Sequence, residues 1–414
     1  MRGSQPKRGV PAVAIVMALV VGGVHPKTAA THCRAKHWVG VWATSPSDAQ
    51  GGPFLDQTLR LVVYPTFGGS RVRVRLSNRF GTQPVSFAAA TIARRASGAD
   101  LEPGTVRRLR FARQRSVTIA PGGETVSDQA RLEFSAFQDL VVSLHVAGAS
   151  GPATEHVTAL QTSYLSPTGG GDHTGDAAGD AFASTLTTWP FLTDVEVRTS
   201  RRLQALVALG DSITDGLMSP TDQNRRYPDV LARLLAAADV PLAVQIEAIS
   251  GNQVLRDGPL PSFGPKLLDR LDHDALDQAG ASAVLLMEGT NDIGVPPPPT
   301  AAQVIAGLQT VVDRLRGAGF RVILGTIPPC RNFALALHGT PEAIAARNVI
   351  NDWIRSSGAA DGVADFHAAL RDPDDPDRLR PAFDSGDHLH PNAAGYAAMA
   401  DAIDLDLLRN LPCR

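Results

Sequence analysis

Residues 205–216 read ALVALGDSITDG, and the interpretation of the whole chain starts from this stretch. A short apolar run ends at Gly210, and a serine, Ser212, follows two residues later. This pattern is typical of a buried parallel strand that brings a polar residue to the carboxyl edge of an α/β sheet, where such folds place their active sites. A serine there can lie at the N-terminus of a helical turn, next to free backbone N–H groups.

Strand-like and helix-like patterns alternate along the chain after residue 200. The strand-like runs lie at residues 206–209, 244–249, 283–287, 322–327 and 363–365. The helix-like patterns lie near residues 228–238, 264–271, 300–316, 341–355 and 392–408. This alternation predicts an α/β domain with a parallel sheet over residues 201–414.

The chain before residue 200 has a different, β-type pattern. Short apolar or alternating runs lie at residues 59–64, 71–76, 86–93, 117–119, 131–134, 140–146 and 159–165, with glycine-rich turns between them. Arg71, Arg73 and Arg75 alternate with aliphatic residues, which favours a strand with one buried and one solvated face over a ligand-binding ladder. We therefore expect an all-β, sandwich-like or jelly-roll domain over residues 37–200.

Length and composition describe a soluble, two-domain protein. The chain has 414 residues, a net charge of −2 and 5% aromatic residues, so its composition gives no reason to expect a nucleic acid as partner. Residues 1–30 combine an early basic segment, an apolar run at 10–24 and small residues after it, which predicts a secretory signal peptide. We expect a secreted protein, extracellular or periplasmic, without a stable membrane anchor.

Three cysteines follow the predicted signal peptide. Cys33 and Cys413 lie near the two ends of the mature chain, and because domain termini often lie close together, we hypothesise a disulfide between them. Cys330 would then be the free thiol. The cysteine spacing matches no zinc pattern. The chemistry expected below needs no metal and no other cofactor.

Four polar clusters fall at the carboxyl ends of predicted strands or in the loop after the last one. They are residues 210–212, 249–252, 288–292 and 384–392. Parallel strands bring their carboxyl ends to one edge of the sheet, where α/β folds build their sites.

The residue types in these clusters suit nucleophilic catalysis. The Ser212 hydroxyl needs a base, and histidine is the usual one when an acceptor fixes its second ring nitrogen. Asp387 and His390 are three residues apart, so a single turn can supply both partners. The backbone N–H groups of Ser212 and Gly251 and the side-chain amide of Asn291 could stabilise the developing oxyanion.

With these residues in place, the second half of the chain resembles the SGNH, or GDSL, hydrolase family of esterases and lipases. The resemblance rests on the segments 210–212, Gly251, 289–292 and 387–390, which look like the four blocks of that family. It implies a flavodoxin-like domain of five parallel strands, with Ser212 as nucleophile, His390 as base, and Asp387 as the acid that orients it. It also implies that Ser212, Gly251 and Asn291 form the oxyanion hole. The preceding β region, from Trp38 onward, looks like the N-terminal part of larger secreted members.

The sequence also allows other roles for the residues of the last cluster. Asp384 could replace Asp387 as partner of His390, and His388 with His390 could form a metal pair, although the sequence offers no third ligand. Asp211 and Asp292 are interpreted as hydrogen-bonding supports of their turns.

The sequence therefore predicts a secreted serine esterase or lipase whose partner is a small-molecule or polysaccharide ester. The first alternative is a carbohydrate O-acetylesterase, in which the β-domain would grip a sugar. The second is a non-catalytic wall- or glycan-binding protein with a vestigial hydrolase fold.

Overall fold

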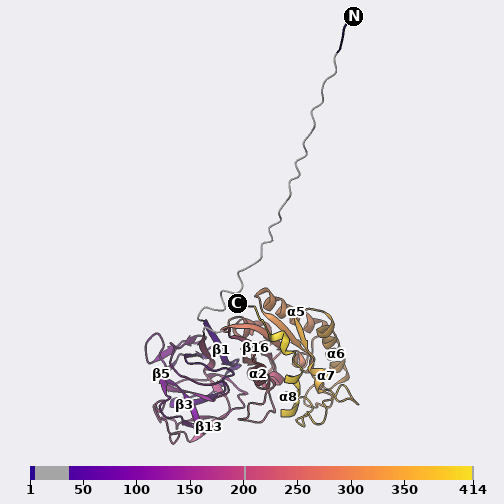
Figure 1. The fold of residues 1–414 in the computed structure, drawn as a ribbon. Helices are drawn as coiled ribbons and strands as arrows, with labels where there is room; N and C mark the ends of the chain where they lie inside the picture. The colour runs from indigo at the N-terminus through magenta and orange to yellow at the C-terminus, as the bar shows by residue number, and fades with distance from the viewer. Residues whose placement is uncertain (5–36, 200–201, 413–414) are drawn as a thin grey trace.

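The computed structural model describes residues 1–4, 37–199 and 202–412. The predicted signal peptide beyond residue 4 and the hypothesised Cys33–Cys413 pair lie outside these residues. Within them the chain forms an antiparallel β region followed by an α/β region, and the two lie side by side (Figure 1).

A five-stranded parallel sheet forms the centre of the α/β region. Its strand order is β17 (Leu242–Ala248), β16 (Gln204–Gly210), β18 (Ala281–Met287), β19 (Arg321–Gly325) and β20 (Gly362–Ala364). This is the flavodoxin-like order, which confirms the predicted fold class. Gly210 is in register with Ala248 on one side and Met287 on the other, so the three strands end level and their following turns meet at one edge.

Helices cover both faces of this sheet because successive strand residues point to opposite faces. One face is covered by α2 (Tyr227–Ala237), α7 (Phe366–Leu370) and α8 (Ala393–Asp401), and the other by α5 (Ala301–Gly317) and α6 (Pro341–Ser356). Leu206, Leu285 and Ile323 of the sheet share a buried cluster with the first three helices. Val207, Leu286 and Val322 share another with α5 and α6. The shorter helical segments are α1 (Ser212–Asp215), α3 (Leu267–Leu271), α4 (Thr290–Gly294), 3₁₀ turns at Pro261–Phe263 and Leu405–Leu408, and a π turn at Asp272–Leu276.

The β region is antiparallel throughout its described pairings. One sheet contains β1 (His37–Ala43), β15 (Leu192–Thr199), β4 (Val72–Ser77) and β9 (Glu124–Val126). The largest sheet contains β13 (Ser184–Leu186), β12 (Ser163–Leu165), β3 (Leu55–Val63), β10 (Leu140–Ala149), β5 (Val85–Ser97), β6 (Asp100–Leu101), β7 (Arg107–Arg108) and β8 (Val117–Ile119). A third, small sheet contains β14 (Trp189–Pro190), β11 (Ala153–His156) and β2 (Asp48–Gly51).

Three local expectations from the sequence differ from the structure, wholly or in part. Residues 131–134 form no strand and make only an isolated bridge, from Phe134 to Gly69. The arginine face of β4 is not simply solvated, because Arg73 and Arg75 form ion pairs with Glu196, at 2.5 and 3.6 Å, and are only 25% exposed. The helix expected over residues 392–408 ends at Asp401, since the Asp404 side chain caps a separate 3₁₀ turn.

The two regions share a continuous hydrophobic core. Buried residues of the β region, such as Val39 and Val41, belong to the same apolar cluster as Val207 and Leu209 of the parallel sheet. Buried polar contacts also cross the boundary, and the Ser45 hydroxyl lies 2.7 Å from the Glu247 carboxyl group. Among the described residues, no helix has the length and apolar character that crossing a bilayer requires.

Candidate active site

Ser212 lies at the first position of α1, directly after the central strand. The Asp211 side chain caps this helical turn by accepting the Ile213 N–H at 3.0 Å. Ser212 is 5% exposed, and its backbone N–H, at the helix N-terminus, donates to no other group in the described part of the chain. The predicted strand–turn–serine arrangement is therefore present.

His390 and Asp387 approach Ser212 from the loop before α8. The Ser212 Oγ lies 2.8 Å from His390 Nε2, and His390 Nδ1 lies 2.6 Å from Asp387 Oδ2. Burial raises the pKa of Asp387, but the hydrogen bonds from the His390 ring and from the backbone N–H groups of His390 and Leu389 outweigh it and hold the pKa well below its ordinary value. Asp387 thus stays ionised and fixes the ring with its Nδ1 proton towards the carboxylate.

The structure separates the other carboxylate and histidine of this loop from the Ser212–His390 pair. Asp384 accepts from His388 Nδ1 at 2.7 Å, whereas His390 Nδ1 contacts Asp387, so the alternative in which Asp384 orients His390 is wrong. Within residues 1–4, 37–199 and 202–412, no group of three or more His, Cys, Asp or Glu side chains is arranged to hold a metal ion.

Gly251 follows β17 and can offer its N–H to the same edge. It adopts a φ of +83°, and a Cβ added to it would lie 2.3 Å from the Phe263 ring, so only glycine fits this turn without rearrangement. Its N–H, like that of Ser212, has no acceptor among the described residues. A hydrogen bond from Ile249 N–H to the Gly210 carbonyl, at 3.1 Å, ties the turn to the end of β16.

Asn291 lies in α4, directly after β18, and its amide is held from two sides. Its Nδ2 donates to the Asn252 carbonyl at 3.0 Å, and its Oδ1 lies 3.2 Å from His338 Nε2. Burial, and then the nearby His390, lower the pKa of His338 to about 4. His338 is therefore neutral, with its proton on Nε2 so that it can donate to Asn291. The second Nδ2 hydrogen of Asn291 is left for a ligand.

A buried arginine, Arg270, links the turn after β16 to the turn after β17. Arg270 donates to Asn252 Oδ1 at 2.8 Å and to the Gly210 carbonyl at 2.9 Å. It thereby links the end of the serine strand to the residue that holds Asn291. Asp292, beside Asn291, accepts the N–H groups of Val254 and Leu255, which agrees with its interpretation as a turn support.

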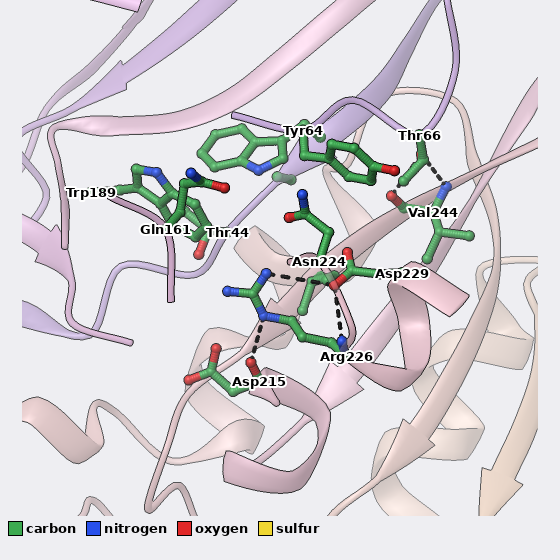
Figure 2. Close-up of a pocket in the computed structure, with 13 residues that line it drawn as sticks. Thr44, Tyr64, Thr66, Gln161, Trp189, Asp215, Asn224, Arg226, Asp229 and Val244 are labelled. Carbon is green, nitrogen blue, oxygen red and sulfur yellow. Dashed lines mark hydrogen bonds and ion pairs between the residues drawn. The ribbon is translucent and has the colours of Figure 1, made fainter. Parts of the chain in front are cut away.

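A small cavity lies beside this site, between the β region and the parallel sheet (Figure 2). Trp42 and Trp189 line it from the β region, whereas Asp215 and Arg226 line it from the α/β region. Neither Ser212 nor His390 lines it. The cavity is therefore distinct from the Ser212–His390 contact.

Sequence reasoning missed two histidines of the site's surroundings. His338 contacts Asn291, and His156 of the β region pairs with Asp215 of the serine turn at 3.1 Å. Neither histidine lies in a local sequence motif. No pattern in a single sequence connects either of them with a partner that lies so many residues away. Cys330, expected to be free, is a buried free thiol.

The fold and the site define an α/β domain with a serine, a histidine and an aspartate together at the carboxyl edge of its parallel sheet. Residues 208–398 match the model of the GDSL-like Lipase/Acylhydrolase family. The resemblance stated from the sequence is confirmed.

Solved structures of GDSL-type proteins are similar to about half of the chain. A putative acylhydrolase from Bacteroides fragilis is 19% identical over 50% of this chain and 87% of its own, with a TM-score of 0.39. The lipase/acylhydrolase from Enterococcus faecalis is 22% identical over 51% and 99%, with a TM-score of 0.39. An acetylxylan esterase from Geobacillus stearothermophilus is 21% identical over 50% and 94%, with a TM-score of 0.38. No curated protein matches the chain significantly.

Proposed function

We propose that the protein hydrolyses carboxylic esters through an acyl-serine intermediate. The observation that carries this proposal is the continuous contact from Ser212 Oγ to His390 Nε2, at 2.8 Å, and from His390 Nδ1 to Asp387, at 2.6 Å. The match of residues 208–398 to an acylhydrolase family supports it. The substrate is a small-molecule or polysaccharide ester, and the reaction needs no cofactor.

Acylation begins when the Ser212 oxygen attacks the ester carbonyl carbon and its proton passes to His390 Nε2. Asp387 stabilises the imidazolium that forms and keeps the ring in place. The carbonyl oxygen becomes an oxyanion, which the N–H groups of Ser212 and Gly251 and the Asn291 amide stabilise. The tetrahedral intermediate collapses as His390 returns the proton to the leaving alcohol, and the acyl-serine remains.

Deacylation repeats these steps with water. His390 Nε2 takes a proton from the water that attacks the acyl-serine, and then returns it to Ser212 Oγ as the acid leaves. The same three donors stabilise the second oxyanion. Ester and water are thus converted into acid and alcohol, and the enzyme returns to its starting state.

We also propose that the protein is exported after removal of residues 1–30, and that residues 37–200 and 201–414 are its two domains. The basic-then-apolar composition of residues 1–30 supports export. The change from antiparallel to parallel sheets after β15 supports the boundary.

Initial rates on p-nitrophenyl esters of increasing chain length test the function. We expect wild type to turn over these esters and Ser212→Ala to lose about 10³-fold or more in kcat. Ser86→Ala, which removes a solvent-exposed hydrogen bond to Thr118 in the β region, serves as a matched control and should keep the wild-type rate. Equal rates for wild type and Ser212→Ala would contradict Ser212 as nucleophile. Activity on acetate alone would favour the carbohydrate O-acetylesterase.

A further inference from the structure

The β region places a histidine in contact with α1 (Ser212–Asp215), the helical turn that carries the serine. His156, the last residue of β11, is buried, and its Nδ1 lies 2.9 Å from the Ser45 carbonyl. Because a carbonyl only accepts, Nδ1 carries a proton. The other ring nitrogen, Nε2, lies 3.1 Å from Asp215 Oδ1, and the ring stacks on Trp189 with centroids 5.6 Å apart. The imidazole is therefore held by a hydrogen bond at Nδ1, an ion-pair contact at Nε2 and stacking on one face.

Asp215 extends this contact to the turn that carries Gly251. Its second oxygen accepts both the backbone N–H of Ser250, at 3.2 Å, and the Ser250 hydroxyl, at 2.8 Å. A second group of the β region, the Thr158 hydroxyl, donates to the same Ser250 oxygen at 3.1 Å. The residue before Gly251 is thus fixed at its backbone and at its side chain.

The electrostatics of this cluster favour a charged pair. Asp215 is 1% exposed, so its carboxylate depends on protein partners. Burial lowers the pKa of His156, but the charge of the nearby Asp215 and the hydrogen bond to the Ser45 carbonyl outweigh burial and raise the pKa above its ordinary value. Arg226 strengthens the turn by donating to the Asp215 carbonyl at 2.8 Å, and its guanidinium lies near the Trp189 ring (Figure 2).

We propose that His156 and Thr158 of the β region are positioning residues for the oxyanion hole. The orientation of the Gly251 N–H is that of the Ser250–Gly251 peptide, and His156 (through Asp215) and Thr158 (directly) hold Ser250. The β region is then a working part of the active site and not only a cover of the sheet. This inference rests on the proposed ester hydrolysis.

Two substitutions test the inference by steady-state kinetics on a p-nitrophenyl ester. His156→Phe keeps a ring to stack on Trp189 and removes both nitrogens, whereas Thr158→Val removes only the hydroxyl. Loss of an oxyanion donor costs about 10²–10³-fold in kcat, so a misaligned donor should cost less, about 10–100-fold for His156→Phe and a few-fold for Thr158→Val. KM should stay within about twofold. His156→Gln, whose amide can still donate to Asp215, should restore part of kcat.

A matched control separates positioning from general destabilisation. His145, another histidine of the β region, pairs with Asp56 at 2.9 Å, away from the serine turn. His145→Phe should leave kcat at the wild-type value. If His156→Phe and Thr158→Val lower Tm without lowering kcat, the positioning role is overturned.

A double-mutant cycle tests the route of the effect. Because Thr158 acts through the Ser250 hydroxyl, Thr158→Val should lose its effect on kcat in a Ser250→Ala background. The same fold-loss in both backgrounds overturns this route.

Hydrogen exchange of the peptide spanning residues 248–253 decides the inference independently of turnover. The inference predicts faster exchange there in His156→Phe than in wild type and in His145→Phe, and unchanged exchange overturns it. A wild type without esterase activity would contradict the proposed function, and the exchange result would still show whether His156 holds the turn.

Discussion

His390 is the residue on which the candidate chemistry depends. Its Nδ1 faces an ionised Asp387, so the ring proton lies on that side and Nε2 is left to accept the Ser212 proton. Each ring nitrogen therefore has one partner and one role. No other histidine among the described residues is placed between a carboxylate and the serine hydroxyl.

His338 provides the residue-scale prediction, because it holds the Asn291 amide. We expect His338→Leu to lower kcat on a p-nitrophenyl ester by about tenfold with little change in KM, since Asn291 stays present but loses the donor that fixes its Oδ1. His338→Gln, which can still donate, should keep most of the activity.

His367→Leu is the matched control for this prediction. His367 is also buried, and burial likewise lowers its pKa to about 4, but it lies in α7 and has no hydrogen bond to Asn291. Wild-type kcat for His338→Leu, or an equal loss in both variants, would contradict the role of His338.

At the scale of elements, the start of α8 holds the loop that carries Asp387 and His390. The Asn392 side chain accepts the N–H groups of Ala394 and Gly395, as a helix cap does. Its Nδ2 donates to the carbonyls of Ala382 and Asp384, each at 3.0 Å. One side chain thus joins the helix end to the catalytic loop.

Asn392→Ala should therefore lower both stability and activity. Loss of the cap and of two further hydrogen bonds should cost about 2–3 kcal/mol of unfolding free energy, and kcat should fall because the His390 loop loosens. Denaturant unfolding and ester kinetics measure the two effects. Thr300→Ala removes the cap of α5 and should cost about 1 kcal/mol without changing kcat. Unchanged kcat in Asn392→Ala would show that the loop with Asp387 and His390 does not depend on the Asn392 hydrogen bonds.

The long elements and the motif residues could be predicted from the sequence because their signals are local. The apolar run before Gly210 and the amphipathic pattern of α5 can each be recognised within a short stretch of sequence. Ser212 and His390 meet although 178 residues separate them, since each lies in a polar cluster at the same sheet edge. By contrast, strands of two or three residues, such as β7 and β14, are too short to show a period.

The positioning contacts could not be predicted for a different physical reason. The contact of His338 with Asn291 spans 47 residues and joins a loop to a helical turn. The contact of His156 with Asp215 joins two regions whose relative placement no periodicity specifies. Such contacts arise from packing between elements.

At the scale of the whole molecule, buried carboxyl groups make stability depend on pH. Burial raises the pKa of Asp211 to about 7 and those of Asp292 and Asp194 to about 6. In the unfolded chain these groups titrate near 3.9, so the folded state binds more protons between pH 4 and 7 and loses stability as pH rises through that window. His338 and His367, whose pKa values are lowered to about 4, have the opposite effect: they raise folding stability as pH rises from about 4 to 6.5. They are two groups against three carboxyl groups.

We therefore expect the free energy of unfolding to be lower at pH 8 than at pH 5, by about 1–3 kcal/mol. Urea denaturation at the two pH values measures this difference. Asp211→Asn keeps an acceptor for the Ile213 N–H and removes one titrating group, so its stability should fall less between pH 5 and pH 8. Greater wild-type stability at pH 8 would contradict the account of these buried acids.

The central claim is that Ser212 forms a covalent acyl intermediate, and the most direct measurement is its trapping. The wild-type protein is mixed with a p-nitrophenyl ester and quenched in acid within the first turnover. It is then digested, and the masses of its peptides are measured by mass spectrometry. We predict one added acyl group on the peptide that contains Ser212 in wild type, and none in Ser212→Ala. An acyl group on another residue, or none on wild type during turnover, would contradict the claim.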